Sequence, residues 1–236
     1  YPPPTPPYPA SGFDSRPYRL QAPHVDFFEV DKPEVVAKKQ ARVMRHHLKT
    51  TGKSLTYVPA DLRTMTVQAA LQRTSTFDPS SKTIFVVEGL AYYLDDSSLK
   101  DLFESLGRIA ASGSRLVFDY SNRCLIDATC ANLNPIYQAV FLAMMRLGLN
   151  EPYLSGFEPG ELKRWLARFG WAERENLPFS DAREPPLSVE SWPNSASKPS
   201  PIALFAEFNF ASAERVGAMG LDCLILPGGG GDDSCS

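Results

Sequence analysis

Four short apolar runs, rich in Val, Phe and Tyr, recur at regular intervals along the first half of the chain. They are VDFFEV (25–30), LTYVPA (55–60), TIFVVE (83–88) and RLVFDY (115–120). Longer amphipathic segments separate them, and the runs begin about thirty residues apart, close to the ~30 residues of one strand-helix-strand unit. This alternation predicts an α/β domain with a mostly parallel sheet and crossover helices.

The amphipathic segments carry recognisable start and stop signals for helices. Asp95 and Asp96 can cap a helix that has an apolar stripe, because a short side-chain acceptor satisfies the first backbone donors. We expect Gly113 to end this helix, because a glycine tolerates the terminal turn. Further helices are expected over 33–49, 135–147 and 159–170, and a last strand over 201–210.

The two ends of the chain differ in composition from the part between them. Residues 1–10 hold prolines at six positions, which exclude a hydrogen-bonded helix or strand, and residues 217–236 are rich in Gly and polar residues. We therefore expect an irregular leader (1–10), one domain (11–216) and a flexible tail (217–236). Because the sequence starts at Tyr1, we also expect a fragment, a processed form or a faulty gene model.

Composition excludes several classes of function. The 24 basic and 27 acidic residues nearly cancel, so a broad nucleic-acid-binding surface is not expected. No segment has the ~20 apolar residues of a membrane span, and no signal peptide is recognised, which favours a cytoplasmic protein without membrane contact. The four cysteines have no CxxC spacing, so we expect free thiols and no metal site.

Acidic residues close or follow each of the four apolar runs. Ligands of open α/β sheets bind beyond the carboxyl ends of the strands, where such side chains can accept hydrogen bonds from ribose hydroxyls or amines. The repetition at four successive strands favours a binding site over four unrelated solvated loops. The strand-end acids are Glu29 and Asp31, Asp61, Glu88, and Asp119, which is followed by Tyr120.

A turn around Gly12 precedes the first run. SGFDSRPYRL (11–20) is typical of a strand-to-helix turn in which a glycine lets the backbone approach a ligand closely. A dinucleotide-binding fingerprint would have three glycines there, so a nucleotide-dependent dehydrogenase is disfavoured. An ordinary turn glycine remains the other interpretation.

Longer motifs extend this pattern and resemble a known family. GFDSRPYRL, FFEVDKP, YVPADLR, TIFVVEGLAYYL, GSRLVFDY and SGFEPGELKRWLARFGW occur in the order seen in leucine carboxyl methyltransferases and their bacterial relatives. The resemblance spans about residues 11–175. It implies a Rossmann-like class I methyltransferase fold with a mostly parallel twisted sheet, a reversed last strand, helices on both faces and S-adenosyl-L-methionine as the cofactor.

The resemblance also implies a set of cofactor-binding residues. Gly12 matches the later glycine of the cofactor loop, Asp31 with Glu29 beside it matches the carboxylate after the second strand, and Glu88 matches the acid at the methionine end. Asp61 and Leu62 match the pair near adenine. Asp14 and Arg16 stand in the cofactor loop, where Arg16 either faces the cofactor carboxylate or braces the loop.

The acceptor pocket is less well defined by sequence. We expect Tyr92, Tyr93 and Tyr120 to border it, with core packing as the other interpretation of Tyr92 and Tyr93. No catalytic residue is assigned, because a carboxylate acceptor is ionised at neutral pH and needs no general base.

The expected activity is transfer of a methyl group to a carboxylate or hydroxyl of a protein C-terminus or a small metabolite. Where relatives have a first strand, this chain has the Pro-rich leader, so the first strand is expected to be missing or degraded and the sheet to have an open edge there. A cofactor-binding but catalytically inactive protein is therefore the alternative.

Overall fold

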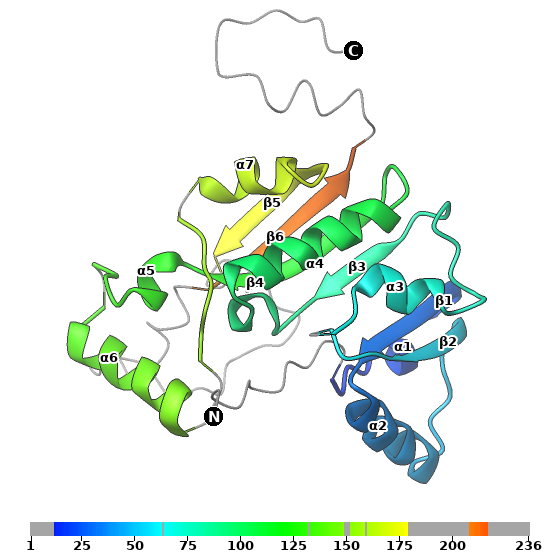
Figure 1. Cartoon of the computed structure of the whole chain (residues 1–236). Helices are drawn as coiled ribbons and strands as arrows, with labels where there is room; N and C mark the ends of the chain where they lie inside the picture. The colour runs from blue at the N-terminus through cyan, green and yellow to red at the C-terminus, as the bar shows by residue number, and fades with distance from the viewer. Residues whose placement is uncertain are drawn as a thin grey trace, which may run out of the picture.

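The computed structural model describes residues 12–62, 64–131, 133–148, 152–158, 160–178 and 208–216. Strands and helices alternate along the chain, with α4 and α7 over one face of the larger group of strands and α2 beside β1 and β2 (Figure 1). In order the elements are α1 (Arg16–Arg19), β1 (Ala22–Asp31), α2 (Pro33–Arg45), β2 (Gly52–Pro59), α3 (Val67–Gln72), β3 (Ile84–Val87), η1 (Ala91–Tyr93), α4 (Asp96–Ile109), β4 (Arg115–Ser121), α5 (Arg123–Ile126), α6 (Pro135–Ala143), η2 (Met144–Gly148), α7 (Glu161–Ala167), β5 (Trp171–Pro178) and β6 (Phe208–Arg215).

The strands form two sheets. β1 pairs in parallel with β2, and the second sheet has the order β3-β4-β6-β5. β3 and β4 are parallel, whereas β6 is antiparallel to both β4 and β5. The predicted α/β class and the reversed last strand are confirmed. The expected single sheet is divided instead, since no strand pairing joins β1 to β3 among the described residues.

Most of the predicted elements are present. Asp95 caps α4 by accepting a hydrogen bond from the Ser98 N–H, as the sequence predicts. The helix ends at Ile109 with Ala110 as its C-terminal cap, so Gly113, which has a positive φ, lies in the following turn and does not end the helix. The predicted helix at 135–147 continues beyond α6 as the wider turn η2. β5 is not predicted from the sequence, and residues 201–207 of the predicted last strand, the leader and the tail lie outside the described residues.

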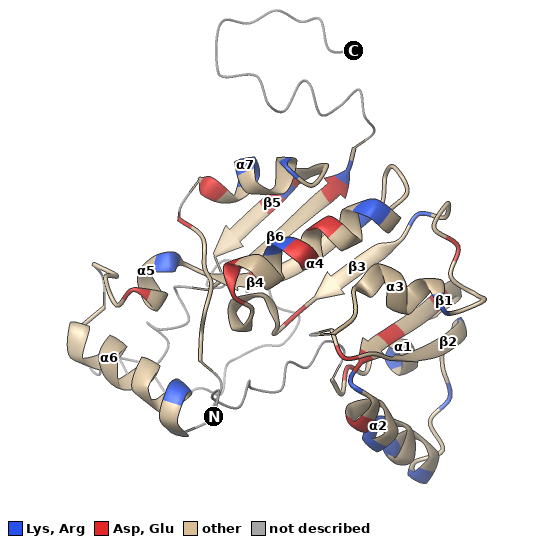
Figure 2. Cartoon of the chain, in the orientation of Figure 1, with Lys and Arg blue, Asp and Glu red and all other residues tan. Residues whose placement is uncertain are grey.

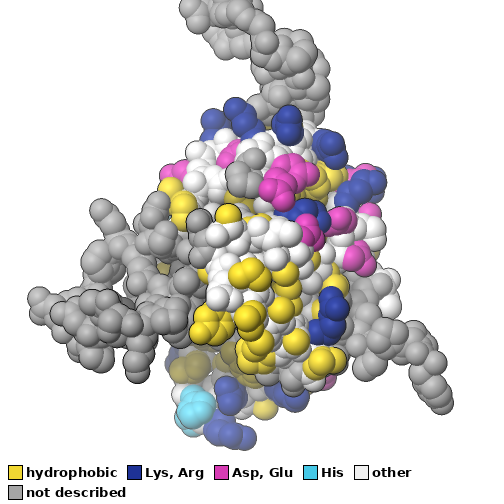
Figure 3. Space-filling model, turned by 90° about the vertical axis from the view of Figure 1, so that its left-hand side faces the viewer, with side chains coloured by type: hydrophobic (Ala, Val, Ile, Leu, Met, Phe, Trp, Pro, Cys, Tyr) yellow, Lys and Arg dark blue, Asp and Glu magenta, His cyan; other side chains and the backbone are white. Residues whose placement is uncertain are grey.

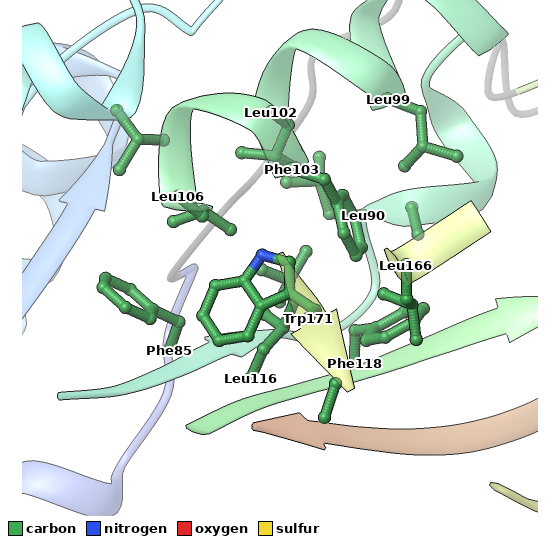
Figure 4. Close-up of a cluster of buried hydrophobic side chains, with 14 of the residues drawn as sticks. Phe85, Leu90, Leu99, Leu102, Phe103, Leu106, Leu116, Phe118, Leu166 and Trp171 are labelled. Atoms are coloured by element: carbon green, nitrogen blue, oxygen red, sulfur yellow. The ribbon is translucent and has the colours of Figure 1, made fainter. Parts of the chain in front are cut away.

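The hydrophobic core lies between the strands and the layer of α3, α4 and α7. Phe103 of α4 is fully buried, and its ring packs edge-on against Phe118 of β4 and Trp165 of α7, with centroids 4.9 and 4.8 Å apart. Trp171 and Phe85 meet in the same cluster (Figure 4). The apolar stripe of α4 therefore packs against strands and helices that belong to the carboxyl half of the chain.

The opposite face of the β1–β2 sheet is covered by α2. Successive side chains of a strand point to opposite faces, so Phe28 and Val30 reach the main core while Glu29 meets Lys39 of α2. In the four-stranded sheet, Ile84 and Val86 of β3 remain exposed on the face away from the core. Among the described residues, α2 therefore covers the outer face of the β1–β2 sheet, whereas the outer face of β3 is exposed.

Two cysteines lie close together after β4. Cys124 and Cys130 form a disulfide with Cα atoms 4.7 Å apart, so the expectation of free thiols is wrong for this pair. Ala128 between them has a positive φ of 55°, which turns the chain back on itself and brings the two residues together. The expectation for Cys223 and Cys235 concerns positions outside the described residues.

The disulfide loop anchors α6 through Gln138. The buried Gln138 side chain accepts a hydrogen bond from the Cys130 N–H and donates to the Cys130 carbonyl (2.9 Å) and the Leu133 carbonyl (3.0 Å). The outer face of α6 and η2 is apolar, on a side where hydrophobic residues gather (Figure 3). Its exposed members are Ile136, Tyr137, Val140, Met144 and Leu147.

We expect the double substitution Cys124→Ser/Cys130→Ser to lower the free energy of unfolding by about 2 kcal/mol, the loop-entropy effect of so short a loop. Amide protons of α6 should exchange faster, because Gln138 binds the backbone of Cys130. Urea unfolding and hydrogen exchange measure both effects. A reductant should reproduce them in the unaltered chain and change nothing in the double variant; unaltered exchange in α6 would contradict the anchoring role.

No helix in the described residues is long and apolar enough to cross a membrane. The same residues contain no group of three or more His, Cys, Asp or Glu side chains suited to hold a metal ion.

Candidate functional site

The Gly12 turn closes on the carboxyl end of β1. The Gly12 N–H donates to Oδ2 of Asp31 at 2.7 Å, and the Lys32 N–H donates to Oδ1 at the same distance. Gly12 has a φ of 49°, a conformation that favours glycine. Asp31 is only 1% exposed, so its carboxylate fixes the turn and the end of the strand in this structure.

Arg16 joins this turn to the end of β3. Its Nε donates to Asp14 at 3.1 Å, and its terminal nitrogen forms an ion pair with Glu88. The Glu88 side chain is 56% exposed and that of Arg16 is 26% exposed, so the pair is accessible at the strand ends. In the structure Arg16 braces the loop, and through Glu88 it links the two sheets.

Glu29 occupies a different environment from the other strand-end acids. It is 4% exposed, and its Oε1 accepts a hydrogen bond from Lys39 Nζ at 2.5 Å. Its Oε2 is buried and has no hydrogen-bond partner among the described residues. Burial raises the pKa of Glu29, and Lys39 opposes that rise. Glu29 therefore lies behind the strand ends, in an ion pair with α2.

Asp61 and Leu62 follow β2 next to the end of β1. The Ala60 N–H donates to the Asp31 carbonyl at 2.7 Å, which brings the segment after β2 beside the Gly12 turn. Asp61 and Leu62 are both half-buried, and Leu62 packs against the core. We call Asp14, Arg16, Asp61 and Glu88 the strand-end site. These are the accessible charged residues of the predicted cofactor set.

A second group of residues lies at the carboxyl end of β4. Asp119 Oδ1 accepts a hydrogen bond from the Gly89 N–H at 2.8 Å, and the Tyr92 hydroxyl also hydrogen-bonds to this carboxylate. Burial is the main cause that raises the pKa of Asp119, to about 6, with a smaller contribution from the negative charge of Glu88.

Aromatic rings gather around Tyr92. We call Tyr92, Tyr93, Tyr153 and Phe208 the aromatic cluster; the ring centroids of Tyr92 lie 4.7 Å from Tyr93, 4.8 Å from Tyr153 and 5.4 Å from Phe208. The sequence predicts Tyr92 and Tyr93 as pocket residues but not Tyr153 or Phe208, which belong to segments far away along the chain. Only tertiary contacts bring them together.

Tyr120 lies on the other side of β4 from Asp119. It is 6% exposed, its ring packs against Phe157 and Phe118, and its hydroxyl donates to Asn176 Oδ1 at 2.9 Å. The structure thus places Tyr120 in the core and not beside Tyr92 and Tyr93, because neighbouring residues of a strand point to opposite faces.

An open groove of about 670 Å³ lies elsewhere, along α4 and the end of α7. Acidic and basic side chains alternate on α4 in this region (Figure 2). Its lining includes Lys100, Arg108 and Arg168, but Asp31, Glu88 and Asp119 do not line it. The groove is therefore separate from the strand-end site.

The segment that carries the strand-end site matches the sequence pattern of a known protein family. Residues 10–107 match the sequence pattern of the family described as leucine carboxyl methyltransferase. Over these residues the chain is similar to leucine carboxyl methyltransferases. The matched segment contains every predicted cofactor residue as well as Tyr92 and Tyr93, whereas Asp119, Tyr120 and Tyr153 lie beyond it.

Two relatives of this chain carry the name "Putative S-adenosyl-L-methionine-dependent methyltransferase". The one from Frankia alni is 34% identical over 164 residues, covering 69% of this chain and 53% of the relative. The one from Mycobacterium leprae is 31% identical over 172 residues, covering 69% of this chain and 52% of the relative. The chain spans about half the length of these curated relatives.

Solved structures show the fold independently. A DUF574 family protein from Streptomyces avermitilis superposes with a TM-score of 0.53 at 15% identity, covering 82% of this chain and 66% of the other. A Thermobifida fusca protein superposes with a TM-score of 0.50 at 16% identity, covering 82% and 64%. The chain therefore has the class I methyltransferase fold.

Proposed function

We propose that this chain binds S-adenosyl-L-methionine at the strand-end site and belongs to an O-methyltransferase. The methyl acceptor is a carboxylate or hydroxyl of a protein C-terminus or a small metabolite. The observation that carries the proposal is the accessible ion pair of Arg16 and Glu88, beside Asp14 and held at the carboxyl ends of the strands. Ligands of α/β sheets bind at this edge.

The chemistry of these side chains fits the cofactor. Its methionine end carries a carboxylate and an ammonium group, which are complementary to the guanidinium of Arg16 and the carboxylates of Glu88 and Asp14. Asp61 offers acceptors for the ribose hydroxyls or the adenine amine, and Leu62 offers an apolar surface for the adenine ring.

Two predicted cofactor residues act indirectly in this proposal. Asp31 holds Gly12 in the turn that carries Asp14 and Arg16, and Glu29 fixes the end of β1 to α2 through Lys39. Both are buried, so they position the site instead of lining it.

When bound, S-adenosyl-L-methionine supplies an already activated methyl group. The residues of the chain then have to align donor and acceptor and keep water away, and alignment of this kind contributes several kcal/mol to catalysis. The half-buried Asp61 and Leu62 and the aromatic cluster are suited to exclude water.

Calorimetric titration with S-adenosyl-L-methionine tests the proposal. Glu88→Gln should weaken binding by about 10- to 100-fold, since hydrogen bonds to charged groups contribute about 1.5–3 kcal/mol. The matched control is Glu104→Gln, a half-buried carboxylate of α4 in the separate groove. Equal affinities of the two variants, or no binding by the unaltered chain, would exclude the strand-end site.

A cofactor-binding but inactive protein is the second candidate. Two features favour this candidate. The strands are divided into two sheets, and the carboxylate of Asp31 already accepts a hydrogen bond from the Gly12 N–H. This candidate predicts that the chain binds S-adenosyl-L-methionine in the calorimeter but transfers no labelled methyl group to any acceptor.

A further inference from the structure

The carboxylate of Asp119 lies at the carboxyl end of β4, next to the end of β3 that leads into Glu88. Glu88 and Gly89 follow β3, and the Gly89 N–H donates to Asp119 Oδ1 at 2.8 Å across to the end of β4. The aromatic cluster packs beside it, because Tyr92 hydrogen-bonds to the same carboxylate. A small number of polar groups beside aromatic walls is typical of a small-molecule site.

The aromatic cluster is fixed from several directions. The Leu154 N–H donates to the Tyr92 carbonyl at 2.7 Å, and the Ser155 hydroxyl donates to the Ala91 carbonyl at 2.9 Å. These bonds tie η1 to the segment that carries Tyr153, whose ring lies 5.7 Å from Phe208. An aromatic ring can join such a cluster by offset or edge-on packing.

The charges around Asp119 disfavour an anionic acceptor. Glu88 is the charged group that acts on Asp119, and the neighbouring titratable groups of η1 and the following segment are the tyrosines 92, 93 and 153. Phe210 of β6 pairs with Asp119 and is uncharged. Asp119 forms no ion pair within the described residues, and Arg16 is engaged by Asp14 and Glu88. A second carboxylate placed here would meet like charge.

We propose that the acceptor is a phenolic hydroxyl and that Asp119 is its general base, with the aromatic cluster holding the ring. This inference rests on the proposed function and narrows its acceptor. The hydroxyl proton passes to Asp119 as the oxygen lone pair forms the bond to the methyl carbon. The bond from that carbon to the donor sulfur breaks, and its electron pair stays on sulfur, which becomes a neutral thioether.

The protonation behaviour of Asp119 is consistent with this role. Because burial raises its pKa to about 6, the carboxylate is ionised at neutral pH yet more basic than an exposed aspartate. Activity on a phenol should therefore rise with pH through about 6. Asp119→Asn should remove that rise, since the amide cannot accept the proton.

The test measures transfer of labelled methyl groups from S-adenosyl-L-methionine to two acceptors matched in shape, 4-methylphenol and 4-methylbenzoate. We expect kcat/KM to be at least about tenfold higher for the phenol. Asp119→Asn should lower kcat for it by roughly 10²- to 10⁴-fold, the usual contribution of a general base. Asp101→Asn, an exposed residue of α4, is the control and should retain full activity.

Two further measurements distinguish a loss of catalysis in Asp119→Asn from a loss of folding or of cofactor binding. The thermal midpoint of Asp119→Asn should equal or exceed that of the unaltered chain above pH 6, because a raised pKa means that ionisation of Asp119 costs stability there. Calorimetry should give its Kd for S-adenosyl-L-methionine within about twofold of the unaltered value. Faster methylation of the benzoate, full activity of Asp119→Asn, or cofactor binding without methylation of the phenol would overturn the inference alone. Absence of cofactor binding would overturn the proposed function as well.

Discussion

Replacement of Lys39 by methionine is expected to lower the free energy of unfolding by about 3–5 kcal/mol at pH 7. Lys39 and Glu29 are each 4% exposed and their charged atoms lie 2.5 Å apart, so the substitution leaves a buried carboxylate without its partner. Oε2 of Glu29 has no hydrogen bond among the described residues even with Lys39 in place. Urea unfolding followed by circular dichroism measures the loss.

Two comparisons identify the cause of this loss. Lys53→Met removes the partner of Asp26 from an exposed pair and should change stability little, because solvent screens that pair. The double variant Glu29→Gln/Lys39→Met should regain most of the stability, since it removes both buried charges. A loss as small as that of Lys53→Met would show that the buried charge is solvated and the explanation wrong.

The same substitution should change the response to pH. Burial raises the pKa of Glu29 and Lys39 counteracts the rise, so without Lys39 the folded-state pKa is raised further above that of the unfolded chain. A carboxyl whose pKa is raised by folding stabilises the fold when protonated, and this contribution disappears as pH rises through the folded-state pKa. The deficit of Lys39→Met should therefore shrink at acidic pH.

The second large effect is expected from Phe103→Ala. Phe103 is fully buried at the centre of α4, between the rings of Phe118 and Trp165, and removal of a buried Phe ring leaves a cavity and costs about 3–5 kcal/mol. Denaturant unfolding measures it. Tyr137→Ala on the exposed face of α6 is the aromatic control and should cost much less. Equal losses would place the main core elsewhere.

Sequence patterns determined the elements whose signals are local. The apolar stripe of α4 and the cap at Asp95 depend on neighbours within a few residues along the chain, and both are present as predicted. β5 has the polar sequence WAERENLP and lies at the edge of its sheet. An edge strand need not bury both faces, so its sequence lacks the pattern that marks the other strands.

The candidate site shows the same division between local and long-range information. Sequence alone placed acids at the strand ends, and the structure brings Asp14, Arg16 and Glu88 into contact there. The sequence alone could not show that Asp31 and Glu29 are buried while Glu88 is accessible. Exposure depends on α2 and the Gly12 turn, whose packing is set by contacts distant along the chain.

The sequence by itself determined the α/β class, the reversed last strand expected from the family resemblance, and the residue types at the strand ends. Tertiary structure decided that the strands divide into two sheets, that Cys124 pairs with Cys130, and that Tyr120 enters the core while Asp119 joins the aromatic cluster. The physical reason is that periodicity and turn chemistry act over a few residues, whereas pairing, burial and pKa depend on side chains that only folding brings within a few ångströms.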